Sequence, residues 1–373
     1  MLPASKAGHY VIRTTKDFDM KHIIFNPSNN PENQYISLLV NGIRRHRFYV
    51  HDLNSIFASW DHFKKIELVH LNWFENIDDS SSKKGLISYF RKMLVLRIIR
   101  LSGKKLVWTM HNRESHEKKT GKMANKITKL LVKWSDAIVI HSKMSRDLLL
   151  ENHAISPDKI HHIPHPNFIG VYGSPLPKTS PISPSLKLLF VGAVKPYKNI
   201  ELLIKTVGEI QGNVELLIAG KARDKAYAEH LIELAKPYPW ITLRLQFIPD
   251  GLLPELIGKS DALVLPYDLG SSLNSGTVIL AFSYKKTVIC PNIGTLCDME
   301  EVEEQFFGYS YQSPEEHEAV LKESILKAAA LKNAQPEAIY AMGLRMQEYI
   351  DHTHGQHEAA NKLVNLYQGL LQN

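Results

Sequence analysis

Cysteine is nearly absent from this 373-residue sequence: Cys290 and Cys297 are too few for a disulfide framework or a four-cysteine zinc site. No stretch of about 18 uncharged apolar residues occurs, so we predict no membrane-spanning helix. Charged residues such as Lys6, Arg13 and Asp17 interrupt the amino-terminal segment, so we expect no signal peptide there. These absences favour a reducing compartment, and we predict that the protein is cytoplasmic.

Sequence signatures of nucleic-acid-binding modules are also missing. We find no helix-turn-helix, RNA-recognition or zinc-finger pattern, so we expect no nucleic-acid partner. Asp17-Phe18-Asp19 is a triplet of the kind that binds divalent cations, but it precedes the first expected strand instead of following an interior one. We attribute the triplet to chance and predict no metal site.

The composition that remains is typical of a globular protein, with 44% hydrophobic and 22% charged residues. At this length one hydrophobic core rarely suffices, so two domains are expected. Short apolar runs alternate with segments of helical period in both halves of the chain, which predicts parallel sheets covered by helices. The predicted fold is therefore α/β, with two tandem Rossmann-like doubly wound domains that face each other across a cleft.

A segment rich in proline and serine marks the boundary between the halves. We expect one domain at residues 1–170, a linker at 171–185, a second domain at 186–350, and a C-terminal helix at 351–373 that packs back on the first domain. The expected strands are 22–25, 47–51, 67–71, 106–110, 137–141, 161–163, 188–191, 216–219, 241–247, 262–266 and 287–290. The expected helices include 33–45, 86–101, 118–134, 199–211, 225–236 and the segment 336–372.

A strand, a glycine turn and a helix start follow one another at residues 190–200, where the second domain opens. Gly192 is followed by Lys195 and Lys198. Backbone N–H groups, the positive end of a helix dipole and a cation would converge here, which is an arrangement that binds phosphate. Strand–glycine–helix turns also occur in proteins that bind no phosphate, so this loop alone does not decide the function.

Five segments in one order extend the pattern, at residues 190–200, 217–221, 247–250, 260–267 and 271–291. Together they resemble the C-terminal domain of GT-B glycosyltransferases, especially family 4 and its relatives. The resemblance implies a nucleotide-sugar donor, a UDP- or GDP-sugar, as a substrate, with no cofactor and no metal. The donor-binding residues that it implies are Lys195, Lys198, Lys221, Phe247, Ile248, Asn274, Ser275, Gly276 and Thr277.

Three positions depart from the family pattern. Ala193 occupies the place of an arginine that holds the donor diphosphate. Ser272 and Leu280 occupy the places of two glutamates, one of which contacts the reacting sugar and the other the ribose. Small polar residues at the helix start suit a diphosphate, although Ser275 or Asn274 could equally serve as a helix N-cap. The chain therefore resembles a divergent relative, and the resemblance leaves open whether the sugar configuration is retained or inverted.

The resemblance implies that the first domain holds the acceptor and the catalytic residues. The segment 107–117 has the strand-then-His-Asn pattern of family relatives, and His111 matches a histidine near their reacting sugar. We expect His111 to contact the sugar, and Glu114 or Glu117 to act as the general base. Other polar residues at strand ends, Glu75 among them, remain alternatives.

Positive charge is concentrated in this first domain. Residues 83–133 contain fifteen Lys or Arg against two Glu, so the segment carries +13, whereas the whole chain carries +7. Helix 118–134 has an apolar stripe beside a lysine stripe, and helix 86–101 is apolar nearly all round, as a buried helix or one at a membrane surface would be. We predict an anionic membrane surface as a partner and a peripheral location on the inner face of the cell membrane.

The predicted function is that of a hexosyltransferase in bacterial surface polysaccharide biosynthesis. The predicted acceptor is a saccharide linked to a polyprenyl diphosphate, which would explain a basic face beside the acceptor domain. Two alternatives stay open on the same fold: a non-catalytic pseudo-glycosyltransferase, because both glutamates are missing, and a nucleotide-sugar epimerase.

Overall fold

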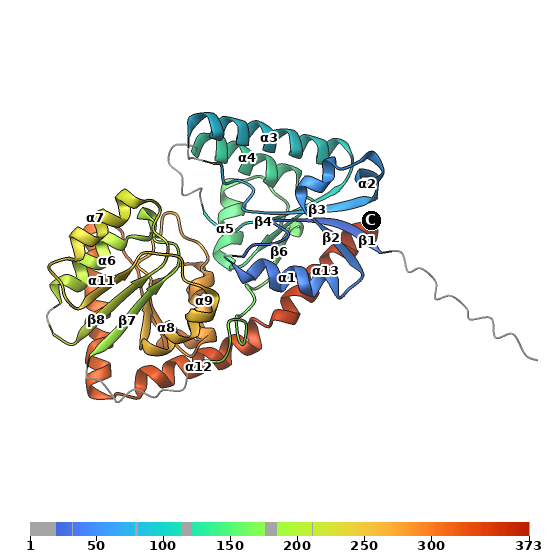
Figure 1. Cartoon of the computed structure of the whole chain (residues 1–373). Coiled ribbons are helices and arrows are strands. Elements are labelled where there is room, and N and C mark those ends of the chain that lie inside the picture. Colours follow the sequence, from blue (N-terminus) through green and yellow to red (C-terminus); the bar gives the residue numbers. More distant parts are fainter. Residues whose placement is uncertain are drawn as a thin grey trace, which may run out of the picture.

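The computed structural model describes residues 20–31, 33–78, 81–113, 121–175, 185–210 and 212–372. It contains two α/β domains, each built around a six-stranded parallel sheet (Figure 1). The prediction of two tandem doubly wound domains is confirmed. Within the described ranges, no helix is long and apolar enough to span a bilayer.

The N-terminal sheet has the strand order β2-β1-β3-β4-β5-β6. Its strands are β1 (Lys21–Asn26), β2 (Phe48–His51), β3 (Ile66–Asn72), β4 (Lys105–Thr109), β5 (Ala137–Ile140) and β6 (Ile160–His162). Its helices are α1 (Gln34–Arg44), α2 (Trp60–Lys65), α3 (Ser82–Leu101), α4 (Gly121–Trp134) and α5 (Lys143–Asn152), with 3₁₀ turns η1 (Leu53–Phe57) and η2 (Pro157–Lys159).

Successive residues of a strand point to opposite faces of the sheet, and β1 shows how this divides the first core. Ile23 and Phe25 pack on the face that α1 covers, whereas Ile24 packs with α3 and α4 on the other face. All three side chains are fully buried. The first sheet is therefore enclosed on both faces, as parallel sheets require.

The C-terminal sheet has the strand order β12-β11-β10-β7-β8-β9. Its strands are β7 (Leu186–Val191), β8 (Val214–Ala219), β9 (Ile241–Arg244), β10 (Ala262–Val264), β11 (Thr287–Pro291) and β12 (Phe307–Tyr309), the last of which the sequence analysis did not predict. Its helices are α6 (Ile200–Glu209), α7 (Lys225–Ala235), α8 (Leu253–Lys259), α9 (Gly276–Ser283), α10 (Gly294–Cys297) and α11 (Pro314–Ala334), with 3₁₀ turns η3 (Pro196–Lys198), η4 (Asp250–Leu252) and η5 (Glu300–Gln305).

Each sheet has a point at which the order of its strands reverses. The reversal lies between β1 and β3 in the first sheet and between β7 and β10 in the second. In doubly wound folds, the loops beyond the carboxyl ends of the strands separate at this point and leave a crevice for ligands. The loops after β7 and β10 are therefore the expected walls of a binding site.

The segment predicted as helical at residues 336–372 forms two helices, because it breaks at His354 and Gly355. Helix α12 (Ala338–Thr353) packs on α9 of the C-terminal domain. Helix α13 (Gln356–Gln372) packs on α1 of the N-terminal domain, so the chain crosses between the domains a second time (Figure 1). The fully buried Tyr367 of α13 reaches the core of the N-terminal domain, where its hydroxyl forms a hydrogen bond with Nδ1 of His70.

Candidate active site

A cleft of about 580 Å³ lies at the carboxyl edge of the second sheet. The loops after β7, β8 and β9 and the first turns of α9 form most of its wall, and Asn33 at the start of α1 closes it from the N-terminal domain. Its lining residues are Asn33, Phe168, Tyr172, Val191, Gly192, Ala193, Lys195, Gly220, Lys221, Ala222, Arg223, Phe247, Ile248, Asp250, Leu253, Gly276, Thr277 and Leu280.

Two glycine turns make the floor of the cleft. Gly192 and Gly220 have φ angles of 133° and 150°, which residues with a side chain rarely adopt. A Cβ on Gly220 would also overlap the carbonyl group of Gly192. Glycine at both positions lets the turns after β7 and β8 pack backbone against backbone, so a ligand meets main chain here instead of side chains.

The first turn of α9 presents its amide groups to the cleft. Ser275 is the N-cap: its hydroxyl accepts a hydrogen bond from the Val278 amide at 3.2 Å, and its own amide donates to Thr295 Oγ1 at 2.9 Å. Gly276 and Thr277, which come next, both line the cleft, and the hydrogen bonds of the described residues leave their amides without a protein acceptor. Unpaired amides at the positive end of a helix dipole attract an anion.

Three basic side chains line the cleft beside these amides: Lys195, Lys221 and Arg223. The sequence analysis included the two lysines but not Arg223. Its loop pairs with the loop of Ala193, through hydrogen bonds from the Val194 amide to the Lys221 carbonyl and from the Arg223 amide to the Val194 carbonyl, both of 3.0 Å. Arg223 thus stands next to the position at which family relatives have an arginine, and only this pairing of loops reveals it.

Lys198 lies behind the wall of the cleft and is not one of its lining residues. Its ammonium group lies over the ring of Tyr267, 4.1 Å from the centroid. Burial lowers the pKa of Lys198 to about 8; Cys290 opposes this effect, and the nearby charge of Lys195 adds to it. The structure therefore places Lys195, and not Lys198, at the surface that a ligand would touch.

Asn274 and Ser275 were predicted to bind the donor, but neither lines the cleft. The Asn274 amide donates across the domain interface, to the carbonyl of His111 at 3.4 Å and to Ser145 Oγ at 3.3 Å. Ser275 is buried as the helix cap. Of the four residues predicted at this helix start, Gly276 and Thr277 line the cleft, while Asn274 joins the donor side to the predicted catalytic histidine.

Two further sets of predicted positions can be located relative to the cleft: those expected to meet the nucleotide base, and those at which family relatives have the two glutamates. Phe247, whose ring is half exposed, and Ile248 line it at one end. Leu280, at the position of the second family glutamate, lines it with an apolar side chain, and Ser272, at the position of the first, is buried. Neither of the two positions at which family relatives have a glutamate therefore carries a negatively charged side chain in this chain.

His111 follows β4 at the carboxyl edge of the first sheet and is almost fully buried. Its Nε2 donates to Asn72 Oδ1 at 3.0 Å, which leaves Nδ1 as the proton acceptor of the ring. Trp73 stacks on the imidazole with a centroid separation of 4.0 Å. Trp73 has a φ of 49°, an unfavourable conformation for a bulky residue that is typical of functional sites.

Three more histidines surround His111 and form with it a cluster that we call the histidine cluster: His70, His111, His141 and His165. Burial lowers the pKa of His70 and of His165 to about 3 and that of His141 to about 4. Burial, and then the charges of the other three histidines, lower the pKa of His111 well below 6.5. The whole cluster is therefore neutral at pH 7.

The carbonyl of Ile163 fixes the tautomer of one member of the cluster, and Tyr35 of α1 binds the nitrogen that is left as the acceptor. His141 Nδ1 donates to the Ile163 carbonyl at 2.8 Å, so its Nε2 must accept the hydrogen bond from the Tyr35 hydroxyl at 3.1 Å. His165 lies against the donor side, since a Cβ on Gly276 would be 3.1 Å from its Nε2. The histidine cluster thus reaches from the core of the first domain to the first turn of α9.

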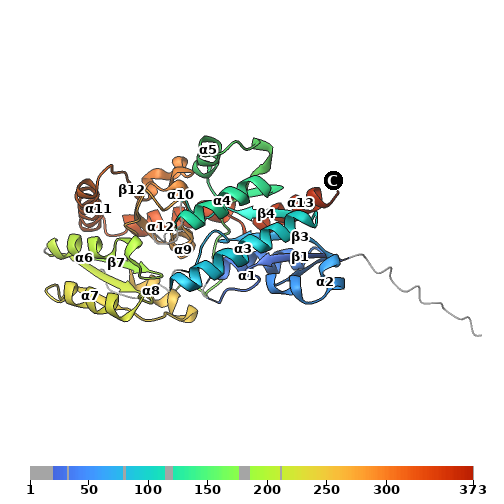
Figure 2. The ribbon, with the colours of Figure 1, turned by 90° about the horizontal axis from the view of Figure 1, so that it is seen from above.

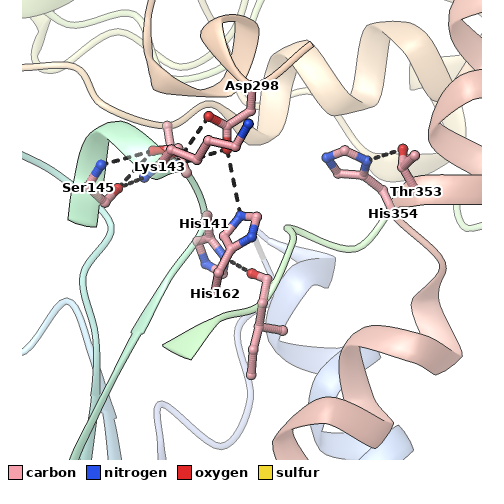
Figure 3. Close-up of polar contacts among 10 residues, drawn as sticks. His141, Lys143, Ser145, His162, Asp298, Thr353 and His354 are labelled. Atoms are coloured by element: carbon pink, nitrogen blue, oxygen red, sulfur yellow. Dashed lines mark hydrogen bonds and ion pairs between the residues drawn. The ribbon is translucent and has the colours of Figure 1, made fainter. Parts of the chain in front are cut away.

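A carboxylate joins the two domains on the other side of α9. Asp298 accepts hydrogen bonds from the Lys143 amide, at 2.9 and 3.2 Å, and thereby caps α5 of the N-terminal domain from the C-terminal domain. It also lies 3.7 Å from His162 Nε2 (Figure 3). Burial raises the pKa of Asp298, while the Lys143 amide opposes that rise. These contacts hold the domains together beside the cleft.

The remaining predicted site residues lie outside the described residues. They are Glu114 and Glu117, expected as the general base. The Asp17-Phe18-Asp19 triplet, which we attributed to chance, also lies outside the described residues. In the part of the chain that the structure describes, no three His, Cys, Asp or Glu side chains are grouped so as to hold a metal ion.

Two families of known proteins match successive parts of the chain. Residues 85–166 match the family described as Glycosyltransferase Family 4, and residues 177–339 match that described as Glycosyl transferases group 1. The first match covers β4, α4 and the histidines that follow β4 and β5. The second covers the whole sheet of the C-terminal domain and the cleft lining except Asn33, Phe168 and Tyr172.

Similar proteins were found among curated sequences and among solved structures. A GDP-mannose:glycolipid 4-beta-D-mannosyltransferase of Xanthomonas campestris pv. campestris is 24% identical over 231 residues, a match that spans 61% of this chain and 62% of that relative. Sucrose-phosphate synthase from Thermosynechococcus elongatus superposes with a TM-score of 0.70 at 14% identity, over 94% of this chain and 99% of that chain. HepE of Anabaena in complex with UDP superposes with a TM-score of 0.63 at 14% identity, over 94% and 100%.

Proposed function

The chain is a divergent GT-B-fold glycosyltransferase related to family 4, and from that premise we propose that it transfers a hexosyl group from a nucleotide-sugar to a saccharide acceptor. The donor binds in the cleft of the C-terminal domain. The acceptor binds against the N-terminal domain, on the side of the histidine cluster.

The observation that carries this proposal is the set of positive groups in the cleft. Lys195, Lys221 and Arg223 stand beside the amides of Gly276 and Thr277, over a floor of glycine backbone. A nucleoside diphosphate carries its charge on the two phosphates, which these groups suit, and has an aromatic base, which the half-exposed ring of Phe247 suits. HepE, which has the same fold, was solved with UDP and with UDP-glucose.

Thermal denaturation with UDP, GDP, UDP-glucose and GDP-mannose tests donor binding, because a ligand that binds only the folded state raises its melting temperature. We expect one nucleotide series to raise it and the other to have little effect. The curated relative is named for GDP-mannose, so GDP and GDP-mannose are the expected pair. If no nucleotide changes the melting temperature, the donor proposal is wrong.

The absence of the glutamate pair supports transfer with inversion of configuration. GDP-mannose is an α-glycosyl phosphate, so a β-mannoside, the product in the relative's name, forms from it by inversion. In this step the acceptor oxygen bonds to the anomeric carbon on the face opposite the diphosphate. The bond from that carbon to the phosphate oxygen breaks, the nucleoside diphosphate leaves with the electron pair, and a base takes the acceptor proton.

We propose His111 as that base. Its Nδ1 is the proton-accepting nitrogen, because Nε2 is engaged with Asn72, and burial keeps the ring unprotonated at pH 7. The negative charge that develops on the diphosphate would stabilise the imidazolium after proton transfer. The predicted bases Glu114 and Glu117 remain the competing assignment, and substitution of each residue in parallel decides between them.

Positive groups of the protein take the place of a metal in this proposal. Lys195, Lys221, Arg223 and the first amides of α9 are preorganised around the site of the departing diphosphate. Transfer should therefore continue at an unchanged rate in excess EDTA. A rate that falls with EDTA and recovers with Mg²⁺ or Mn²⁺ would contradict metal-independent transfer.

The proposed acceptor is a glycolipid, in line with the name of the curated relative, with the saccharide carried on a polyprenyl diphosphate in bacterial surface polysaccharide synthesis. Such an acceptor stays in the membrane, so the enzyme must work at the inner face of the cell membrane. Incubation of the protein with donor and with lipid extracts of bacteria that make such polysaccharides, followed by mass spectrometry, should show one added hexose on a lipid-linked saccharide.

A further inference from the structure

Helix α3 carries an apolar row that the fold leaves uncovered. Leu86, Ile87, Phe90, Leu94 and Leu101 expose 49%, 68%, 60%, 54% and 87% of their surface. The opposite side of the helix is buried in the core, through Met93, Leu96 and Ile99. We call these five exposed residues the α3 row. In the part of the chain that the structure describes, no other α-helix carries more than one large hydrophobic side chain that is exposed, which makes the row unusual.

The geometry of the row suits a surface and not a groove. At 3.6 residues per turn the five side chains fall within roughly 100° of arc, along about 22 Å of helix from Leu86 to Leu101. Lys84 and Arg91 border the row on one side and Arg100 on the other, while Arg97 projects from within it between Leu94 and Leu101; all four are exposed. Aliphatic and aromatic side chains bordered by long basic ones are typical of helices that lie in a membrane interface.

Helix α4 extends the basic border. It packs beside α3, and both helices cover the same face of the N-terminal domain (Figure 2). Its exposed lysines, Lys122, Lys126, Lys129 and Lys133, recur every three or four residues and so form one stripe. Neither α3 nor α4 contains an aspartate or a glutamate. The face therefore combines an apolar centre with positive charge alone.

We propose that the α3 row enters the headgroup region of a bilayer that contains anionic lipid, with the α4 lysine stripe held against the lipid phosphates. This proposal rests on the proposed glycolipid acceptor, and it adds which surface meets the membrane and how. The charge of the face is complementary to an anionic leaflet, and the apolar row supplies the contact that charge alone would lack.

A second copy of the chain and a nucleic acid both suit this face less well. Two copies joined through the same face would bring the basic borders of both α3 helices together, without an acidic residue on either helix to pair with them. A nucleic acid would satisfy the lysines but would leave the aliphatic side chains of the row in contact with phosphate and water. Of these three occupants, a bilayer is the one that offers both anionic groups and hydrocarbon.

The place of α3 in the fold connects the face to the active site. Helices α3 and α4 follow β3 and β4, so both begin at the carboxyl edge of the sheet. His111 and Trp73 follow the same two strands at that edge. A bilayer under the α3 row would therefore present a membrane-embedded acceptor at the end of the domain where the histidine cluster lies.

Vesicle sedimentation tests the proposal, with phosphatidylcholine alone and with phosphatidylcholine that contains 30% phosphatidylglycerol, a mixture chosen to be about as anionic as a bacterial inner leaflet. We expect the full chain to bind only the anionic vesicles at low salt. The triple variant Ile87→Ser, Phe90→Ser and Leu94→Ser should bind them at least about tenfold more weakly. The matched control is Ile232→Ser with Leu326→Ser, which removes half-exposed apolar side chains of the C-terminal domain and should bind like the wild type.

A second variant reports insertion without removing the row. With Phe90→Trp, lipids brominated on their acyl chains should quench more fluorescence than in the wild type, because the new indole enters the bilayer. Equal quenching in the two proteins would overturn the proposal, as would unchanged vesicle binding by the triple variant. A wild-type dimer that the triple variant abolishes, or binding of a 20-nucleotide RNA in preference to the vesicles, would identify a different occupant.

The nucleotide-dependent rise in melting temperature separates this proposal from the proposed function. The triple variant should keep that rise in full, because the cleft lies in the other domain. It should also keep transfer to a water-soluble, short-chain acceptor while it loses transfer to the acceptor in vesicles. If the wild type binds vesicles through the α3 row but shows no nucleotide effect, the proposed function is wrong and the membrane surface stands.

Discussion

The two domains share one architecture but prepare opposite environments at the edges that face each other. The C-terminal domain presents basic side chains and main-chain amides around a floor of glycine, and Lys195 and Arg223 line the cleft. The N-terminal domain buries aromatic rings and neutral imidazoles, with Tyr35 and Trp73 packed against His111. In the transfer proposed above, the first edge would hold the diphosphate of the donor and the second would accept the proton of the acceptor.

Replacement of the proposed base should have the largest effect and would sharpen this contrast. In His111→Ala we expect kcat to fall by about 10³- to 10⁴-fold while nucleotide affinity stays unchanged, since the residue belongs to the proton-accepting edge. Steady-state transfer and a nucleotide titration measure the two quantities. His230→Ala, on the exposed surface of α7, is the control.

Glu114→Gln and Glu117→Gln should be assayed beside that variant. If one of them loses activity to the same extent and His111→Ala retains it, the base is the glutamate, and His111 is left with the sugar contact that the sequence predicted.

Acid should weaken the N-terminal domain next most strongly. The folded-state pKa values of His70, His165 and His141, about 3, 3 and 4, lie below the unfolded value of 6.5. Between about pH 6.5 and pH 4 the unfolded chain therefore binds more protons, so stability is complete above pH 6.5 and falls as the pH falls through this window. Three groups at roughly 1.4 kcal/mol per pH unit each make the protein about 4 kcal/mol less stable at pH 5.5 than at pH 7.5.

Urea denaturation of the full chain at the two pH values measures this loss. The variant His165→Asn removes one titrating group and should reduce the difference by about 1.4 kcal/mol. Equal unfolding free energies at pH 5.5 and pH 7.5 would show that the histidine cluster is not neutral and buried as the structure has it.

Loss of Arg223, which the sequence analysis did not include, should have a smaller effect. We expect it to change nucleotide binding in the cleft of the C-terminal domain only. We expect Arg223→Ala to weaken nucleoside diphosphate binding by about 10- to 100-fold, the usual contribution of a hydrogen bond to a charged group. Isothermal titration measures it, with Arg244→Ala as a control that makes the same change of net charge on an exposed residue of the same domain.

A second substitution tests the reason for that effect. Ala193→Arg in the Arg223→Ala background restores a cation at the position where family relatives have one, and it should recover most of the lost affinity. Lys198→Ala, behind the wall of the cleft, should weaken binding less than Arg223→Ala. The opposite order would favour Lys198 as the diphosphate ligand that the sequence predicted.

The smallest effect should come from the contact that joins the two edges. Asn274→Ala removes the hydrogen bonds to the His111 carbonyl and to Ser145, and we expect kcat to fall about 3- to 10-fold with little change in nucleotide affinity. A double-mutant cycle with Ser145→Ala should give a coupling energy of about 0.5–1 kcal/mol. Zero coupling would show that the Asn274–Ser145 contact does not operate in solution.

Much of the fold was predictable from the sequence, because it follows from the periodicity of the apolar residues and from the order of the strand and helix segments. The alternation of apolar runs and helical segments predicted both sheets, and eleven of their strands. Strand β12 was missed because Phe307–Tyr309 is only three residues long. Its pattern of apolar and polar residues does not differ from that of the residues around it. A C-terminal helix that packs on the first domain was predicted from residue 351, and α13 does so from Gln356. The break itself, at His354 and Gly355, was not predicted because the apolar residues on either side keep a helical period.

The candidate site was predictable where it depends on main chain, and less so where it depends on side-chain direction. The turns of Gly192 and Gly220 and the start of α9 are local, so the sequence shows them. Arg223 is near the cleft only because two loops pair, and Asn274 points across the domain interface instead of into the cleft; neither relation has a local signal. The α3 row was not predicted for a related reason. The sequence of a helix that is apolar all round does not show which of its sides the rest of the fold leaves exposed.

The return of α13 to the first domain has a consequence for how the protein is made. Tyr367 packs beside His70 of β3, in a site that exists once β3 and β4 have paired. Tyr367 is nevertheless synthesised only after the entire C-terminal domain. At translation rates of about 5–20 residues per second, the roughly 200 residues between β6 and Tyr367 take about 10–40 s to synthesise. The domain that is translated first is therefore completed last, and until then its core has an open side that chaperones of the cell would be the first to meet.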